Sequence, residues 1–414
     1  MTLTKTLTLS LFGSAASLLA LQPAVALDAQ AFVDRFETVY ESFGYALEFG
    51  ATKLKGDTIV VEGVTVGLKG MEDSAMTFDT ELTFSGVTEL PDGGFMARQM
   101  TLPDVETDIE EEVPGHVSLK DIVLEGLYLP GGDAIDAQAM MQLYGTMRTG
   151  PLSITRNGAE VFSIQSMEAG NVFNPAQGSA ELVDIASHMN IKGLSVDLST
   201  VKDEDPAAGA TIEGLGLTRI NGDIAESLKW TMADGRMVVD QFLFDFADVG
   251  AVDIKVDIAG LTPALLDQIY AMQASMLAEG TDPASEEAQA AQMMAGMQIA
   301  QALTITSASV RYDDASIAGR LLDFFAAQQG IERAQLVEGL KAMVPQMVAG
   351  AGIPALGELV AGPTATFLDD PQSVEVSIQP ATPASILVLS AAAANPAGLI
   401  NALGLTVTAN QAAQ

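Results

Sequence analysis

Cysteine is absent from the 414 residues of this chain, and only two histidines, His116 and His188, are present. Without thiols the chain has no disulfide bonds, no lipidated cysteine and no thiolate-bound metal cluster. Two histidines without cysteine also leave too few ligands for an ordinary zinc, copper(II) or haem site. We therefore expect no metal and no cofactor.

Aromatic and basic residues are also scarce. Trp230 is the only tryptophan, and six tyrosines accompany it, so glycosidases, which usually hold sugars against aromatic rings, are disfavoured. Nineteen basic residues stand against 54 acidic ones, which gives a net charge of −35. Such a charge repels nucleic acid and anionic lipid head groups, so we expect no nucleic-acid partner.

Long apolar runs are missing beyond the first 26 residues, so the sequence predicts no later membrane span. The first 26 residues contain Lys5, a mostly apolar stretch from Leu7 to Leu21, and the small-residue site Ala24-Val25-Ala26. This order is typical of a cleavable signal peptide. We expect export to the periplasm, with a mature chain that begins at or near Leu27. Secretion beyond the periplasm and anchoring by an uncleaved signal are the alternatives.

One short pattern recurs: an apolar residue, any residue, glycine, Val or Leu, any residue, then Val or Leu. The alternation predicts strands with one buried face, and glycine inside such a strand predicts a bulge or a close backbone approach. The glycines lie near multiples of about 20–23 residues apart, which is typical of a repeat built from strand pairs. The full copies contain Gly63, Gly126, Gly193 and Gly214, and looser copies contain Gly86 and Gly260.

The remaining patterns place strands before helices. Apolar residues at helical spacing predict a helix over Asp28–Phe43, and strand-like segments fill the chain from Tyr45 to about Ile258. The sequence Arg156-Asn157-Gly158-Ala159 predicts a two-residue hairpin turn. After Gly260 helices dominate, and the first is expected to start at Thr262-Pro263.

Together these elements predict an α+β fold. We expect a large, curled, mostly antiparallel β-sheet of repeat-like strand units, with an N-terminal helix and a helix-rich C-terminal third packed on it. The expected divisions are the signal peptide at 1–26, the N-terminal helix and sheet region at 27–260, and an α+β region at 261–414 that continues the sheet.

Apolar side chains in the helical region are the candidates for ligand contact. Methionines at helical spacing favour core packing, with an apolar ligand-contacting face or copper(I) binding as alternatives. A second group lies on the helix that follows Asp313 and Asp314, and we expect it to fill a groove in the sheet only partly. The methionines are Met272, Met276, Met293, Met294, Met297, Met343 and Met347, and the second group is Leu321, Leu322, Phe324 and Phe325. We take Met272 and Met276 with the second group as the candidate site.

No residue emerges as catalytic. Carboxylate runs at 106–112, 203–205 and 369–370 lack the spacing of a calcium loop, and in so acidic a chain we interpret them as solvated surface. His116 follows Pro114-Gly115 and is expected in a loop, and neither histidine lies near a nucleophile motif.

The layout resembles AsmA-like and YdgA-like exported proteins of Gram-negative bacteria. The segment from Val310 to Ile317 (VRYDDASI), continued by Arg320-Leu321-Leu322, is similar to a strand-to-helix segment of such chains, as is the helix start at Leu261-Thr262-Pro263. Many AsmA-like proteins stay membrane-anchored, whereas the signal here has a cleavage site. The resemblance implies an elongated, curled sheet with an apolar inner face and a role in envelope maintenance or lipid handling, and it carries over no catalytic residue.

Three functional hypotheses follow. The first is a periplasmic non-enzymatic protein whose β-groove holds lipid or another apolar ligand. The second is an envelope scaffold or interaction protein, with envelope proteins as partners, whose core is filled by its own helices. A hydrolase with an unrecognised carboxylate site ranks below both. The first hypothesis requires more inward-facing apolar positions than the chain's own helices can cover.

Overall fold

The computed structural model describes residues 27–42, 44–69, 75–110, 113–132, 135, 142–175, 182–277, 285–350, 354–392 and 395–412. The predicted signal peptide, residues 1–26, lies outside this part of the chain.

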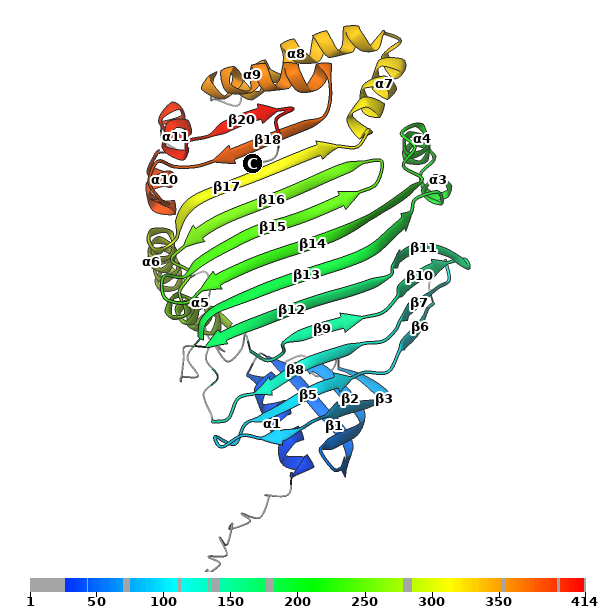
Figure 1. The fold of residues 1–414 in the computed structure, drawn as a ribbon, viewed down its shortest axis with the longest axis vertical. Coiled ribbons are helices and arrows are strands. Elements are labelled where there is room, and N and C mark those ends of the chain that lie inside the picture. The colour runs from blue at the N-terminus through cyan, green and yellow to red at the C-terminus, as the bar shows by residue number, and fades with distance from the viewer. Residues whose placement is uncertain are drawn as a thin grey trace, which may run out of the picture.

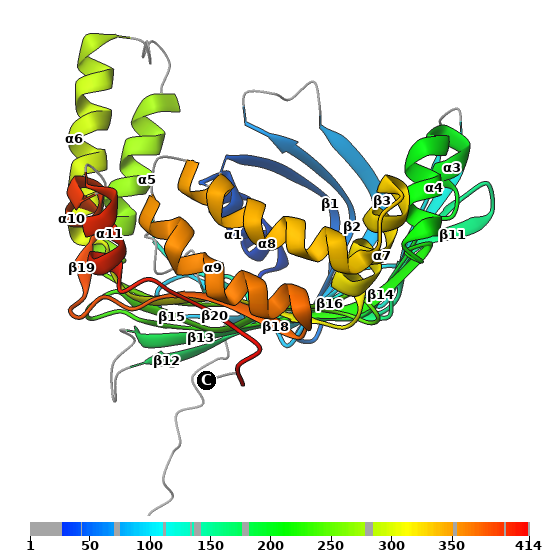
Figure 2. The ribbon, with the colours of Figure 1, turned by 90° about the horizontal axis from the view of Figure 1, so that it is seen from above.

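One antiparallel sheet dominates the molecule, and it contains 20 strands within the described residues. The sheet curls, so that one face is concave and the other convex (Figures 1 and 2). This confirms the predicted α+β fold with a large, curled antiparallel sheet. The strands of the first half are β1 (Tyr45–Lys55), β2 (Thr58–Leu68), β3 (Met76–Ser85), β4 (Thr88–Glu89), β5 (Phe95–Thr101), β6 (Val105–Ile109), β7 (Gly115–Leu119), β8 (Val123–Leu129), β9 (Thr146–Thr149), β10 (Leu152–Arg156), β11 (Ala159–Ile164) and β12 (Ser166–Pro175).

The second half of the sheet is a meander that continues across residue 260. Each of β13 to β17 pairs with the next, and β16 meets β17 although two helices separate them in the chain. The expected boundary at 260 is therefore a change in composition within one continuous sheet. The strands are β13 (Leu182–Asp197), β14 (Arg219–Thr231), β15 (Arg236–Phe246), β16 (Gly250–Ala259), β17 (Thr304–Asp314), β18 (Ser373–Ile378), β19 (Ala384–Ser385) and β20 (Thr406–Ala409).

Four long strands in the first half are each interrupted once, and the interruptions lie side by side. On one side of them β5, β8, β9 and β12 pair in that order, and on the other side β6, β7, β10 and β11 do so. Backbone hydrogen bonds join neighbouring interruptions, such as Leu102 N–H to the Ile122 carbonyl at 3.0 Å and Lys120 N–H to the Pro151 carbonyl at 3.1 Å. We call residues 102–104, 120–122, 150–151 and 165 the break line.

The helices lie on the concave side. Figure 2 shows α5 and α6 rising at one rim, α3, α4 and α7 at the other, and α8 and α9 crossing above the C-terminal strands. The helices are α1 (Ala29–Glu41), α3 (Val201–Glu204), α4 (Pro206–Gly214), α5 (Pro263–Leu277), α6 (Glu286–Ala302), α7 (Ile317–Gln329), α8 (Arg333–Gly350), α9 (Pro354–Asp369), α10 (Ile386–Ala392) and α11 (Pro396–Leu403).

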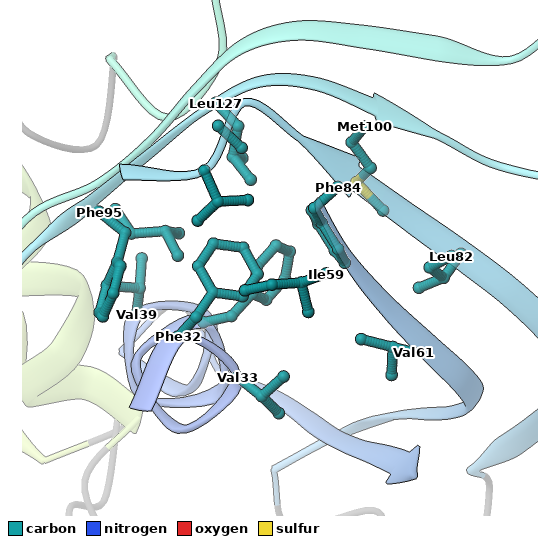
Figure 3. Packing of buried hydrophobic residues seen from close by; sticks show 14 of the residues in the cluster. Phe32, Val33, Val39, Ile59, Val61, Leu82, Phe84, Phe95, Met100 and Leu127 are labelled. Carbon is teal, nitrogen blue, oxygen red and sulfur yellow. The ribbon is translucent and has the colours of Figure 1, made fainter. Parts of the chain in front are cut away.

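The predicted N-terminal helix is α1, and it anchors the largest buried apolar cluster. Asp28 caps it by accepting hydrogen bonds from the backbone N–H groups of Gln30 and Ala31. Phe32 is fully buried between Phe84 of β3 and Phe95 of β5, at ring-centroid distances of 4.9 and 5.5 Å (Figure 3). The first strands thus curl around one face of α1.

Five of the six repeat glycines adopt the left-handed backbone conformation that favours glycine, namely Gly63, Gly86, Gly126, Gly193 and Gly260. Gly63 and Gly193 also lie at register shifts between paired strands, which confirms the predicted bulges. The prediction is wrong for Gly214, which ends helix α4. The side chain of Asp205 caps that helix and Pro206 begins it. These two residues favour a helix through Gly214, although the alternating apolar residues there are typical of a strand.

Two further local predictions have outcomes. Asn157 and Gly158 both have positive φ between β10 and β11, which confirms the two-residue hairpin. The expected helix start is also confirmed, because α5 begins at Pro263 and the Thr262 hydroxyl accepts a hydrogen bond from Leu265 N–H. The loop expected at His116 is wrong, since this residue lies within β7 and pairs with β6 and β10 on either side.

Candidate functional site

The two faces of the sheet differ in chemistry. Residues opposite each other in antiparallel strands point to the same face. One row of such residues is Asp253, Arg311 and Glu375, and the Arg311 guanidinium donates to Asp313 at 2.6 Å and to Glu375 at 3.3 Å. These charge-assisted bonds raise the pKa of Arg311. One face of the second half of the sheet is therefore polar. The residues next to this row along each strand point to the opposite face, and they are apolar.

The apolar face is the concave one. Tyr312 lies edge-on to Phe367 of α9 at 6.3 Å, and Leu266 of α5 packs on the cluster that contains Trp230. Both helices lie inside the curl (Figure 2). We call the apolar side chains of β13–β18 on this side the floor. They are Ile185, Met189, Ile191, Ile224, Leu228, Trp230, Met237, Val239, Phe242, Phe244, Val252, Ile254, Val256, Ile258, Ile305, Ala308, Val310, Tyr312, Val374, Val376 and Ile378.

Much of the floor remains partly exposed. In the described part of the chain, helix packing on the sheet is concentrated on β1, β8, β18, β19 and β20. Val310 and Val376 lie side by side on β17 and β18 and are 48% and 43% exposed, although both face the concave side. Burying apolar surface stabilises a complex by about 25 cal/mol per Å². Because the helices leave part of this apolar surface exposed, an apolar molecule that covered it would form a stabilised complex with the floor.

A groove of about 380 Å³ lies on the floor beside Trp230. The indole N–H of Trp230 donates to the Leu261 carbonyl at 2.8 Å, which fixes the ring at the start of α5. Leu228 and Met237 from the neighbouring strands and Leu266 from α5 complete most of the apolar lining. We call this the Trp230 groove.

A larger cavity, of about 690 Å³, opens where α1 leaves the first strands. Its deepest wall is buried and includes Phe36, Leu82 and Met100, whereas its rim is exposed and includes Asp104 and Glu106. Its volume is within the range of small-molecule sites, roughly 300–1,000 Å³. The cavity extends the α1 cluster toward solvent, at the opposite end of the sheet from α7 (Figure 1).

The predicted ligand-contacting residues of α7 divide between two surroundings. Leu321, Leu322 and Phe325 line an apolar pocket of about 370 Å³ between α7, α8 and α9, where Phe325 is 44% exposed. Phe324 turns instead toward α4, where a Cβ added at Gly214 would lie 2.7 Å from its ring. Three of the four α7 residues thus share one pocket.

The predicted methionines do not join that pocket. Met272 is partly buried on α5, which stands at the rim opposite α7 (Figure 2). Met276 also belongs to α5, and its side chain lies outside the described residues. Core packing is wrong for the other methionines, which are exposed on α6 and α8, with Met293 and Met347 at 69% and 65%. The rim therefore adds further uncovered apolar surface.

The histidines take part in surface ion pairs. The two ring nitrogens of His116 contact Asp108 at 2.7 Å and Glu106 at 2.8 Å, and these hydrogen bonds raise the pKa of His116. His188 lies 3.3 Å from Glu168 on the convex face. Within the described residues no group of three or more His, Asp or Glu side chains is arranged to hold a metal ion.

Two features of the floor escaped the sequence analysis. The rarity of Trp230 does not predict its place on the floor, whereas the alternation of Ile224, Leu228 and Trp230 along one strand does. Glu226 occupies the one position in that alternation where an apolar residue is expected, which is the kind of local conflict that marks functional sites. The signal was present in the sequence as a polar residue within a period-two apolar run.

Comparison with known proteins adds one finding. A family model described as "Uncharacterized protein" matches residues 243–410, which include β16–β18 and the C-terminal helices. No curated protein matches this chain. Neither result bears on the resemblance to AsmA-like and YdgA-like proteins, which stays a prediction. Among the described helices, none is both long and apolar enough to cross a membrane.

Proposed function

We propose that this chain is an exported, non-enzymatic protein of the bacterial envelope that holds lipid acyl chains or another apolar ligand against the floor. The observation that carries the proposal is the floor itself, an extended concave apolar surface that stays partly exposed while the reverse face is polar. Soluble proteins rarely leave large apolar patches uncovered unless they bind something there. The export part of the proposal rests on the signal-like N-terminal residues, and the envelope-maintenance part rests on the resemblance to AsmA-like and YdgA-like proteins.

The Trp230 groove is the proposed point of entry for the ligand. It is concave, mostly apolar, and lined by side chains from β13, β14, β15 and α5, so its shape depends on the packed sheet. The cavity beside α1 and the pocket between α7 and α9 give further apolar volume at the two ends of the sheet.

Organic-solvent extraction of the purified protein followed by mass spectrometry tests whether lipid is carried from the cell. Binding is tested by titrating the protein with an environment-sensitive apolar fluorophore at low and high salt. We expect saturable binding that salt does not weaken, because apolar burial does not depend on screened charges.

A matched pair of variants locates the site. Val239 belongs to the floor and faces Leu228 across the strand pair, whereas Val238 points to the convex face beside Lys229. We expect Val239→Asp to abolish fluorophore binding and Val238→Asp to leave it unchanged. Absence of saturable binding to the folded wild type would reject the ligand function and leave the envelope scaffold as the better hypothesis.

A further inference from the structure

Glu226 is the acidic side chain within the apolar floor. On β14 the residues that face the concave side are Ile224, Glu226, Leu228 and Trp230. Across the strand pairs Glu226 lies between Met189 of β13 and Phe242 of β15. A carboxylate is thus placed where each of its nearest neighbours on the same face is apolar.

No described residue gives Glu226 a hydrogen bond or an ion pair, and none of the paired positions of β13–β18 that face the concave side is Lys or Arg. Burial raises the pKa of this carboxyl group, and the charge of nearby His188 opposes that shift. Removing a polar group from water without a partner is unfavourable. Glu226 is only partly buried, so water still reaches its carboxylate, and a ligand that donates a hydrogen bond to it would take the place of that water.

The Trp230 groove lies directly beside this carboxylate. Leu228 lines the groove, and Glu226 is the next residue along β14 on the same face, about 7 Å away between Cα atoms. A chain lying against Trp230 and Leu228 would therefore bring its polar end to Glu226. The groove lining itself includes Ser187 and Asn171, and a mostly apolar site with a few placed polar groups is the usual design of a small-molecule site.

We propose that Glu226 recognises the head group of a single-chain amphiphile whose tail occupies the Trp230 groove. The head group donates a hydrogen bond, as an ammonium or a hydroxyl does, and carries no negative charge. This inference rests on the proposed function and narrows it. A carboxylate or phosphate head would meet an unpaired negative charge in a chain whose net charge is −35, so free fatty acids bind less well than amines of the same length.

The single tryptophan makes the test specific. Because Trp230 is the only one in the chain and lines the groove, its fluorescence reports occupancy of this site. Decylammonium and decanoate, each below its micelle concentration, and decanol, below its solubility limit, are titrated into the wild type, Glu226→Gln and Asp245→Asn. Asp245 is exposed and points to the convex face of β15, so its variant removes the same charge without touching the floor.

We expect the wild type to bind decylammonium at least about tenfold more tightly than decanoate, with decanol between them. In Glu226→Gln this preference falls to less than about twofold, whereas Asp245→Asn keeps it. Equal affinities for the three probes in the wild type, with a saturable Trp230 response, overturn the role of Glu226 and leave apolar binding intact. The absence of a saturable Trp230 response to every probe overturns this inference together with apolar-ligand binding at the groove.

Discussion

The bulge at Gly193 gives the most direct test of how the repeated glycines shape the sheet. Gly193 has φ +62°, and a Cβ added there would lie 2.4 Å from Cγ and Cδ of Gln165. A non-glycine residue in the left-handed region costs about 1–2 kcal/mol, and displacing the exposed Gln165 side chain adds about 1 kcal/mol. Gly193→Val should therefore lower the free energy of unfolding by about 2–3 kcal/mol.

Gly126 separates these two contributions. Its φ is +69°, but an added Cβ would only reach ordinary contact, 3.4 Å from the backbone of Gly145. Gly126→Val should therefore destabilise by the backbone contribution, about 1–2 kcal/mol. Adding Gln165→Ala to Gly193→Val should recover about 1 kcal/mol, because the steric conflict is then removed.

Urea unfolding followed by far-ultraviolet circular dichroism measures these differences as shifts of the midpoint at constant slope. Lys192→Thr is the control, since the neighbouring side chain is exposed and threonine suits a strand. If Gly193→Val and Lys192→Thr shift the midpoint equally and slightly, the glycine pattern is ordinary strand composition and the reasoning fails.

Three further predictions concern the helices, the surface and the N-terminus. Phe324→Asp should lower the melting temperature by several degrees because its ring packs against α4 beside Gly214, whereas Phe325→Asp should leave the fold intact; equal thermal shifts would contradict the division between them. The pKa of His116 is raised by its two carboxylate partners, so the stability that it contributes is present below a pH of about 6.5 and lost as the pH rises through its higher folded pKa. The thermal advantage of the wild type over His116→Gln should follow that course, and an advantage that grows toward alkaline pH would refute the assignment. N-terminal sequencing of the protein from its native host should find Leu27 or a close neighbour first, and a retained Met1 on a membrane-bound protein would contradict export.

Local patterns predicted well wherever one residue type determines the backbone. Gly63, Gly126 and Gly193 have positive φ because glycine adopts it without a steric penalty, and Asn157-Gly158 makes its hairpin because asparagine also tolerates positive φ. Gly214 was mispredicted because the capping residue and proline that start α4 lie before it, and a helix start outweighs a six-residue alternation.

Contacts between distant elements were harder to predict. Helical spacing showed that the methionines of α6 share a face, but it does not show whether a partner covers that face, and Met293 and Met294 are exposed. Phe324 and Phe325 are neighbours in sequence and belong to different surroundings, because adjacent residues of a helix point in directions about 100° apart. Helical periodicity gives the direction of each side chain around its own helix. It does not show which other helix each side chain contacts, so it could not separate these two residues.

The break line has a mechanical consequence for the sheet. A β-sheet resists bending across its strands because each strand runs without interruption beside its neighbours. Here four adjacent strands are all interrupted at the break line. The strands β6, β7, β10 and β11 therefore form a separate leaf of the ladder, which β11 joins to the continuous part of the sheet through two residue pairs with β13. We expect this leaf to bend about the break line more easily than the rest of the sheet, and because β6 supplies part of the rim of the 690 Å³ cavity, such bending would change the width of the cavity mouth.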